Sequence, residues 1–232
     1  MTTRMYSERR GNISVFRGCG FSCSYCAFRT SLRRSPCEKC RTFEPHAHME
    51  VLDRTPPRTK PGEFITVGLT GDISFMDVAD FWKVIEYCRK WKDRTFLIQS
   101  KKPYYFLRYL EFATPLRIPD NVIIGTTIET NRTTDIISKA PEPALRGYAM
   151  KLLDCRKEIT IEPIMDFDME TMVQWMQVLA PEFIYIGYNS NNNIHLPEPS
   201  LSKTTELIQK LRDEGIEIRE KLMRKAWWEE LE

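Results

Sequence analysis

One stretch of the chain, residues 64–98, reads FITVGLTGDISFMDVADFWKVIEYCRKWKDRTFLI and shows how the fold is built. It begins and ends with short apolar runs, Phe64–Val67 and Phe96–Ile98. These runs are continuously apolar rather than alternating, which is typical of parallel strands covered on both faces. Between them, apolar residues recur at the spacing of one helix face, at Phe81, Val84, Ile85 and Cys88. The stretch therefore predicts a strand–helix–strand unit of a parallel sheet.

The same rhythm extends along the chain. Further apolar runs lie at 13–16, 122–124, 159–161 and 183–186, with a weaker one at 216–218. Helical stripes separate them, at Leu145/Tyr148/Ala149/Leu152, Met172/Val173/Met176/Leu179 and Thr204/Leu207/Ile208/Leu211. Pro103 and Pro141 fall where a first helical turn tolerates proline. Right-handed crossovers between such units predict an α/β fold, a partial (β/α)6 TIM-like barrel that is a few elements short of a complete one.

Length and composition fit one globular domain over residues 1–232. The 232 residues are 42% hydrophobic, enough apolar material for a core, which excludes a disordered chain. The longest apolar runs fall far short of the ~20 residues that span a bilayer. The first ten residues do not resemble a signal peptide. We therefore expect a cytoplasmic protein with no membrane partner.

Charge is distributed unevenly along the chain. Residues 1–62 contain twelve Lys/Arg and five Asp/Glu, a net charge of +7, so the remainder must carry −5 to give the total of +2. This excess favours a polyanionic or phosphate-bearing partner, with nucleic acid as one candidate. Alternatively, the cations compensate the negative charge of metal-bound thiolates nearby.

Cysteine spacing gives the strongest indication of function. Five of the seven cysteines lie between positions 19 and 40, which in a reducing compartment indicates metal or redox chemistry. Cys19, Cys23 and Cys26 form a C-x3-C-x2-C triplet directly after the first expected strand. Three thiolates can hold a cubane iron–sulfur cluster and leave its fourth iron open for chemistry.

With an aromatic residue, Tyr25, just before the last cysteine, this loop resembles that of the radical SAM superfamily. The resemblance implies a [4Fe-4S] cluster that reductively cleaves S-adenosylmethionine (SAM) and yields a 5′-deoxyadenosyl radical for hydrogen abstraction from a substrate. It also implies a one-electron reductant protein of the flavodoxin or ferredoxin type. After its second strand the family often carries a Gly-Gly-Glu-like motif that holds the SAM amino group. The matching stretch here is Gly68-Leu-Thr70-Gly71-Asp72, with Asp in place of Glu.

Polar residues follow the other expected strands, at the end of a parallel barrel where chemistry collects. They are Ser100, Lys101, Thr127, Glu129, Asn131, Glu162 with Asp166, and Tyr188 with Asn189. Within the resemblance, Lys101 is expected to neutralise the methionine carboxylate, and Thr127, Glu129 or Asn131 to bind ribose hydroxyls. The candidate cofactor contacts are Tyr25, Thr70, Gly71, Asp72, Ser100, Lys101, Thr127, Glu129, Asn131 and Glu162.

Residues 27–62 interrupt the rhythm as a basic insertion after the first strand. It contains four soft or borderline metal ligands, Cys37, Cys40, His46 and His48, whose number and types suit tetrahedral Zn. A second iron–sulfur cluster and a cysteine pair without metal are the alternatives. This Cys-x2-Cys insertion leading into Pro45-His-Ala-His48, with the stretch Ile124–Glu129, resembles small radical SAM proteins of the spore photoproduct lyase-like and phage-associated type. That resemblance implies a nucleic-acid-related substrate.

A competing interpretation assigns all five clustered cysteines to structural zinc. The protein would then be a non-catalytic zinc-bearing module that binds nucleic acid. The spacing opposes this, because zinc sites favour paired Cys-x2-Cys units and the triplet is not one. Of the other residues with reactive side chains, Cys88 is expected in the core and Cys155 in a loop at the opposite barrel end. His195 follows the last polar strand end and is expected on the surface, with a position facing the site as the alternative.

Overall fold

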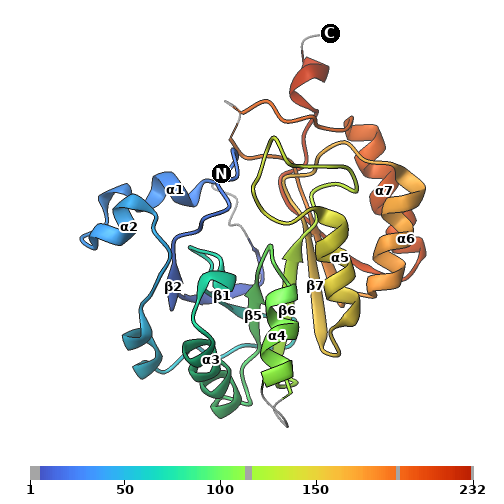
Figure 1. Cartoon of the computed structure of the whole chain (residues 1–232). Helices are drawn as coiled ribbons and strands as arrows, with labels where there is room; N and C mark the ends of the chain where they lie inside the picture. Colours follow the sequence, from blue (N-terminus) through green and yellow to red (C-terminus); the bar gives the residue numbers. More distant parts are fainter. Residues whose placement is uncertain (1–5, 113–116, 192–193, 231–232) are drawn as a thin grey trace.

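The computed structural model describes residues 6–112, 117–191 and 194–230, and a parallel sheet of seven strands forms its centre (Figure 1). The strands lie in the order β1 (Arg9–Ile13), β4 (Phe64–Val67), β5 (Phe96–Gln99), β6 (Val122–Thr127), β7 (Arg156–Ile161), β8 (Phe183–Ile186) and β9 (Glu217–Glu220). In the described part of the chain, β1 pairs in this sheet with β4 alone and β9 with β8 alone. The sheet is therefore a curled half-barrel, which confirms the predicted partial barrel.

Five helices cover the outer face of this sheet: α3 (Val78–Lys90), α4 (Tyr104–Phe112), α5 (Pro143–Leu152), α6 (Met169–Leu179) and α7 (Leu201–Asp213). The stripes predicted for α3 and α7 are buried throughout. In α6, Met172, Met176 and Leu179 are buried, and Val173 packs partly buried against the same core. Apolar burial between these helices and the strands holds the two layers together.

A second apolar cluster occupies the inner face of the half-barrel. It consists of side chains near the starts of the strands together with one from the N-terminal segment, namely Tyr6, Phe64, Leu97, Ile123, Phe183 and Tyr185. These side chains fill the barrel at the amino ends of the strands. The interior is left open toward the carboxyl ends, where polar residues were expected.

The first strand lies four residues earlier than predicted. Ile13 is its last paired residue, opposite Val67, whereas Phe16–Arg17 forms a separate short strand, β2, that pairs antiparallel with β3 (His46–Ala47). Strand β1 is an edge strand whose residues alternate in exposure, so it lacks the continuous apolar run of the central strands.

Helix α5 also differs from its prediction. It begins at Pro143 rather than at Pro141. Leu145, Tyr148 and Leu152 of the predicted core stripe are exposed, and of that stripe Ala149 alone is buried. The helix buries the neighbouring face instead, which carries Pro143, Gly147 and Met150 together with Arg146, an arginine that is 1% exposed and paired with the buried Glu129.

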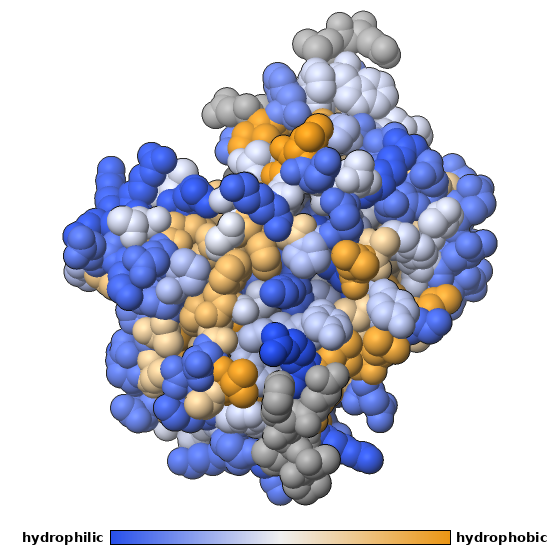
Figure 2. Space-filling view, viewed as in Figure 1, coloured by the Kyte–Doolittle hydropathy of each residue, from blue (hydrophilic) through white to orange (hydrophobic). Residues whose placement is uncertain are grey.

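The insertion carries two short helices, α1 (Phe28–Ser31) and α2 (Glu38–Thr42), which project to one side of the sheet (Figure 1). Hydrophilic side chains cover most of this lobe in the view of Figure 2. Short 3-10 turns complete the chain at Leu32–Arg34, Met49–Asp53, Ile73–Phe75 and Trp227–Glu230. Within the described ranges, every helix is too short or too polar to cross a bilayer.

Candidate functional site

The cysteine triplet lies in a loop that is fixed by backbone contacts on two sides. Gly18 (φ 81°) donates its N–H to the Thr70 carbonyl and accepts from the Asp72 N–H, each at 3.2 Å. On the other side, the Cys19 N–H donates to the Phe43 carbonyl at 3.3 Å. A β-carbon at position 18 would lie 2.1 Å from the Glu44 carbonyl oxygen, so glycine is required there.

All three cysteines of the triplet line one cavity of about 460 Å³ at the carboxyl ends of the strands. Burial, nearby Asp72 and the other two thiols raise the pKa of Cys19 to about 12. The Cys23 sulfur lies 3.0 Å from the Ser138 hydroxyl, and the Ser24 N–H donates to the Ile137 carbonyl at 2.9 Å. The loop thus brings three sulfurs to one cavity, and a nearby cation such as a metal centre would favour ionisation of the buried Cys19 thiol.

Gly71 is the point of closest approach between this loop and the loop after β4. A β-carbon there would lie 2.5 Å from the Gly18 carbonyl oxygen. We expect Gly71→Ala to force the two loops apart and to lower the free energy of unfolding by about 1–3 kcal/mol, measured by urea unfolding of the apo-protein. Gly147→Ala is the control, because its β-carbon meets only a methyl group at 3.8 Å, and it should stabilise α5 slightly. Equal stability of the two variants would contradict this account.

Asp72 joins the ends of β4 and β5. One carboxylate oxygen accepts from the Ser74 N–H at 3.0 Å and the Ser100 hydroxyl at 2.7 Å, and the other from the Lys101 N–H at 2.8 Å. A carboxylate has about four acceptor positions, so three internal bonds leave room for one further donor. Asp72, Gly71, Ser100 and Lys101 all line the cavity.

Behind the cavity wall, Glu129 is completely buried among two cations and a phenol. It is ion-paired with Lys101 and with Arg146, the latter at 2.7 Å, and it accepts a hydrogen bond from Tyr25. Burial alone would raise the pKa of Glu129, but Lys101 and then Arg146 lower it to about 2. The Lys101 ammonium also donates to the Tyr25 hydroxyl at 2.7 Å. This network fixes Tyr25 and Lys101 at the cavity lining.

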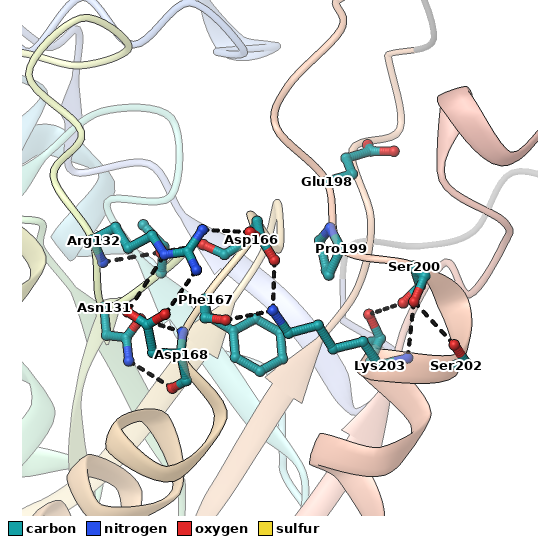
Figure 3. Close-up of polar contacts among 12 residues, drawn as sticks. Asn131, Arg132, Asp166, Phe167, Asp168, Glu198, Pro199, Ser200, Ser202 and Lys203 are labelled. Atoms are coloured by element: carbon teal, nitrogen blue, oxygen red, sulfur yellow. Dashed lines mark hydrogen bonds and ion pairs between the residues drawn. The ribbon is translucent and has the colours of Figure 1, made fainter.

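Three candidates have positions other than those expected. Both carboxylate oxygens of Glu129 are paired inside the protein, so Glu129 orients its neighbours instead of facing a ribose. The Asn131 amide bonds the backbone N–H and carbonyl of Asp168, at 2.9 and 2.8 Å, on the outer surface (Figure 3). The buried hydroxyl of Thr70 lacks a hydrogen-bond partner in the described chain, and Thr70 is not among the lining residues.

Asp166 belongs to the same surface network as Asn131. It is ion-paired with Arg132 and, at 2.7 Å, with Lys203, which also donates to the Phe167 carbonyl (Figure 3). These contacts tie the loops after β6 and β7 to the start of α7. Asp166 is therefore a structural residue of the rim.

The remaining candidates lie at the cavity itself. Thr127, Glu162 and Asn189 line it, and Glu162 is ion-paired with Lys221. Tyr188 is buried and hydrogen-bonded to Thr204 at 2.7 Å, which gives it a role in packing. The predictions for Cys88, Cys155 and His195 are confirmed: Cys88 is buried on α3, Cys155 precedes β7, and exposed His195 stacks on Trp227.

Sequence reasoning missed a polar group inside the half-barrel. Glu158 is fully buried. Burial raises the pKa of its carboxyl to about 7, although hydrogen bonds from Thr160 and Gln99 lower it. Gln99 donates to Glu158 at 2.8 Å and accepts from Tyr6 at 2.7 Å. Gly125 makes room for this arrangement, because a β-carbon there would lie 2.3 Å from a Glu158 oxygen. One indication of this buried group lies in the sequence, where Glu158 directly precedes the apolar run 159–161.

The insertion brings its four predicted metal ligands together. The ligand atoms of Cys37, Cys40, His46 and His48 all lie within 4.8 Å of one another. Cys37 is the N-cap residue of α2, and the nearby backbone N–H groups of Cys40 and Lys39 lower the pKa of its thiol. This cluster is distinct from the triplet, so the five clustered cysteines divide into two groups.

No protein-family model matches the sequence, and no curated protein matches it significantly. Solved structures do match its fold. Spore photoproduct lyase, in complex with a dinucleoside spore photoproduct, aligns with a TM-score of 0.56 and 12% identity over 87% of this chain and 60% of its own. SuiB of Streptococcus suis, bound to its precursor peptide SuiA, aligns with a TM-score of 0.58 and 11% identity over 94% and 49%.

The chain thus spans 60% and 49% of the length of these two relatives, both of which are radical SAM enzymes. Their similarity to this chain is in the partial barrel of parallel strands.

Proposed function

We propose that the protein is a radical SAM enzyme that binds a [4Fe-4S] cluster through Cys19, Cys23 and Cys26 and SAM in the adjoining cavity. One observation carries the proposal: the three thiols line the same cavity as the carboxyl ends of β4 and β5. The donor set fits, since thiolates are the ligands of cubane clusters and three of them leave one iron open. The partial-barrel likeness to two radical SAM enzymes supports it.

When bound, the cluster and SAM together supply an electron transfer that cleaves the sulfonium and yields a 5′-deoxyadenosyl radical. The chain's own residues bind and orient. Asp72 keeps one acceptor position for an ammonium group while it holds the ends of β4 and β5 in register. Thr127 offers a hydroxyl at the lining, and the buried pair of Glu129 with Lys101 keeps Tyr25 in place. A cavity of about 460 Å³ has the size of a typical small-ligand site.

We further propose a nucleic-acid or other phosphate-bearing substrate and a flavodoxin- or ferredoxin-type reductant. Phe28 of α1 lines the cavity, and Arg29 next to it is exposed. Arg33, Arg34 and Arg41 are exposed on the same lobe. Exposed guanidinium groups on a lobe next to the cavity favour phosphate, which they bind in a forked geometry. The bound dinucleoside of spore photoproduct lyase gives this substrate class additional support.

Anaerobic reconstitution with iron and sulfide tests the proposed function. We expect a brown protein that, with dithionite and SAM, forms 5′-deoxyadenosine and methionine, measured by mass spectrometry. Binding of SAM should also change the electron paramagnetic resonance spectrum of the reduced cluster. A protein that stays colourless and leaves SAM intact would contradict the proposal and favour the non-catalytic zinc-bearing module.

A further inference from the structure

The Cys/His group of the insertion has the dimensions of a metal site. The His46 Nε2 atom lies 3.4 Å from the Cys37 sulfur and 3.3 Å from the Cys40 sulfur. The Cys40 sulfur lies 3.5 Å from the His48 Nε2 atom, and the two Nε2 atoms are 2.9 Å apart. Ligands around one tetrahedral Zn²⁺, with Zn–S of ~2.3 Å and Zn–N of ~2.0–2.1 Å, would lie roughly 3.3–3.8 Å from one another. The three sulfur–nitrogen distances fall in this range, and the two Nε2 atoms lie closer together than it.

The outward ring nitrogens fix the orientation of both histidines. His46 Nδ1 donates to the Glu44 carbonyl at 2.7 Å, and His48 Nδ1 lies 3.0 Å from a Glu50 carboxylate oxygen. A neutral imidazole that donates through one nitrogen presents a lone pair at the other. The two Nε2 lone pairs and the two sulfurs, which lie within 4.8 Å of one another, are therefore together available to one cation. Metal-binding histidines characteristically have such carbonyl or carboxylate partners.

We propose that Cys37, Cys40, His46 and His48 bind one Zn²⁺, and that this ion fixes the strand pair from which the cysteine triplet extends. A closed set of two thiolates and two imidazoles is typical of structural zinc. The effect of the ion on the triplet loop rests on the proposed function, because this loop would hold the iron–sulfur cluster. The zinc site itself does not depend on the proposed function.

The contacts between the two groups run through β2 and β3. Arg17, two residues before Cys19, pairs directly with His46, and its guanidinium lies 3.6 Å from the Cys40 sulfur. The His48 N–H donates to the Val15 carbonyl at 2.7 Å. Phe43, which follows α2 and lines the cavity, accepts the Cys19 N–H at 3.3 Å. Release of the ion would free β3 from its pairing with β2. It would also weaken the contact with Phe43, which is one of the two supports of the cysteine loop.

The second half of the insertion packs against the main core through Met49, Val51 and Leu52, but its first half has little apolar packing to order it. Residues 27–62 carry eight Lys/Arg and four Asp/Glu, and neither α1 nor the turn Leu32–Arg34 has a buried residue. In such a segment a metal ion replaces the missing apolar core.

Metal analysis of the full chain, purified without added metal or chelator, tests the zinc site. We expect one zinc per chain, independent of the iron content. Replacement of zinc by Co²⁺ should give the intense visible absorption of tetrahedral thiolate-bound cobalt. Zinc well below one per chain after purification in zinc-supplemented medium, or a cobalt spectrum without thiolate charge-transfer bands, would overturn the site.

A matched pair of variants tests the ligand orientation without removing a ligand. Glu50→Gln weakens the acceptor of His48 Nδ1 and should lower zinc affinity about 10- to 100-fold, measured by competition with a chromogenic chelator. Glu44→Gln is the control, since His46 uses the backbone carbonyl of that residue and not its side chain. Equal affinities of the two variants would contradict the proposed arrangement.

The double variant Cys37→Ser/Cys40→Ser tests whether the zinc site supports the triplet loop. Cys155→Ser is its control. The double variant should lose zinc, become protease-sensitive between residues 27 and 62, and after reconstitution retain less iron than the control. Zinc loss with full iron retention would overturn the coupling but leave the zinc site intact. Absence of iron from the wild-type protein as well would instead count against the proposed function.

Discussion

Alanine at any one of Cys19, Cys23 and Cys26 is expected to abolish the iron–sulfur cluster and SAM cleavage altogether. Three thiolates are the set that holds a cubane with one open iron, and two leave a second iron without a protein ligand. Iron and sulfide content, visible absorption and 5′-deoxyadenosine formation after anaerobic reconstitution measure the effect.

Cys155→Ala is the control for these variants, because Cys155 precedes β7 at the opposite end of the barrel. It should retain the iron content and the product yield of the wild type. Full iron content and SAM cleavage in any one of the three triplet variants would show that the cluster is bound elsewhere.

Arg146→Met is expected to destabilise the apo-protein by about 3–5 kcal/mol, the usual effect of removing one partner from a buried ion pair. Glu129 and Arg146 are both fully buried at the side chain and lie 2.7 Å apart. Urea unfolding followed by tryptophan fluorescence measures the change. Arg156→Met removes a partly exposed pair with Glu182 and should cost less than about 1 kcal/mol. Similar losses in both variants would contradict the importance of the buried pair.

The same pair predicts how stability depends on pH. The pKa of Glu129 is about 2 in the folded chain against an ordinary value of 4.5, so the unfolded state binds the proton more readily. The ionised carboxylate therefore contributes its full stabilisation above pH 4.5, and this contribution is lost as the pH falls toward 2. The difference in stability between wild type and Arg146→Met should accordingly narrow across that window.

Most of the fold could be predicted because its signals are local. The central strands are buried on both faces and read as continuous apolar runs, as Phe64–Val67 does. Two predicted elements differ from their predictions, each for a reason that lies outside its own sequence. Strand β1 is half-exposed at the sheet edge, and the buried face of α5 includes an arginine, Arg146, whose partner Glu129 lies outside the helix.

The candidate site was only partly predictable. The triplet and the residues at the ends of β4 and β5 could be placed together, because the carboxyl ends of parallel strands meet at one edge. The direction in which a side chain points after the end of a strand could not be predicted. Asn131, for example, turns outward and bonds Asp168. Lys221 follows the last strand, β9, and the sequence shows nothing of its pairing with Glu162 across the cavity.

The supports of the cysteine loop also set the order in which the protein can be assembled. Cys23 contacts Ser138, 115 positions further along the chain, and the Lys139 N–H donates to the Phe21 carbonyl at 2.7 Å. At a synthesis rate of about 5–20 residues per second, the cysteines emerge from the ribosome on the order of ten seconds before these partners. In the nascent chain the three cysteines are therefore exposed before the residues that position their loop have been synthesised. The proposed cluster would therefore be inserted after translation has passed β6 and the segment that follows it.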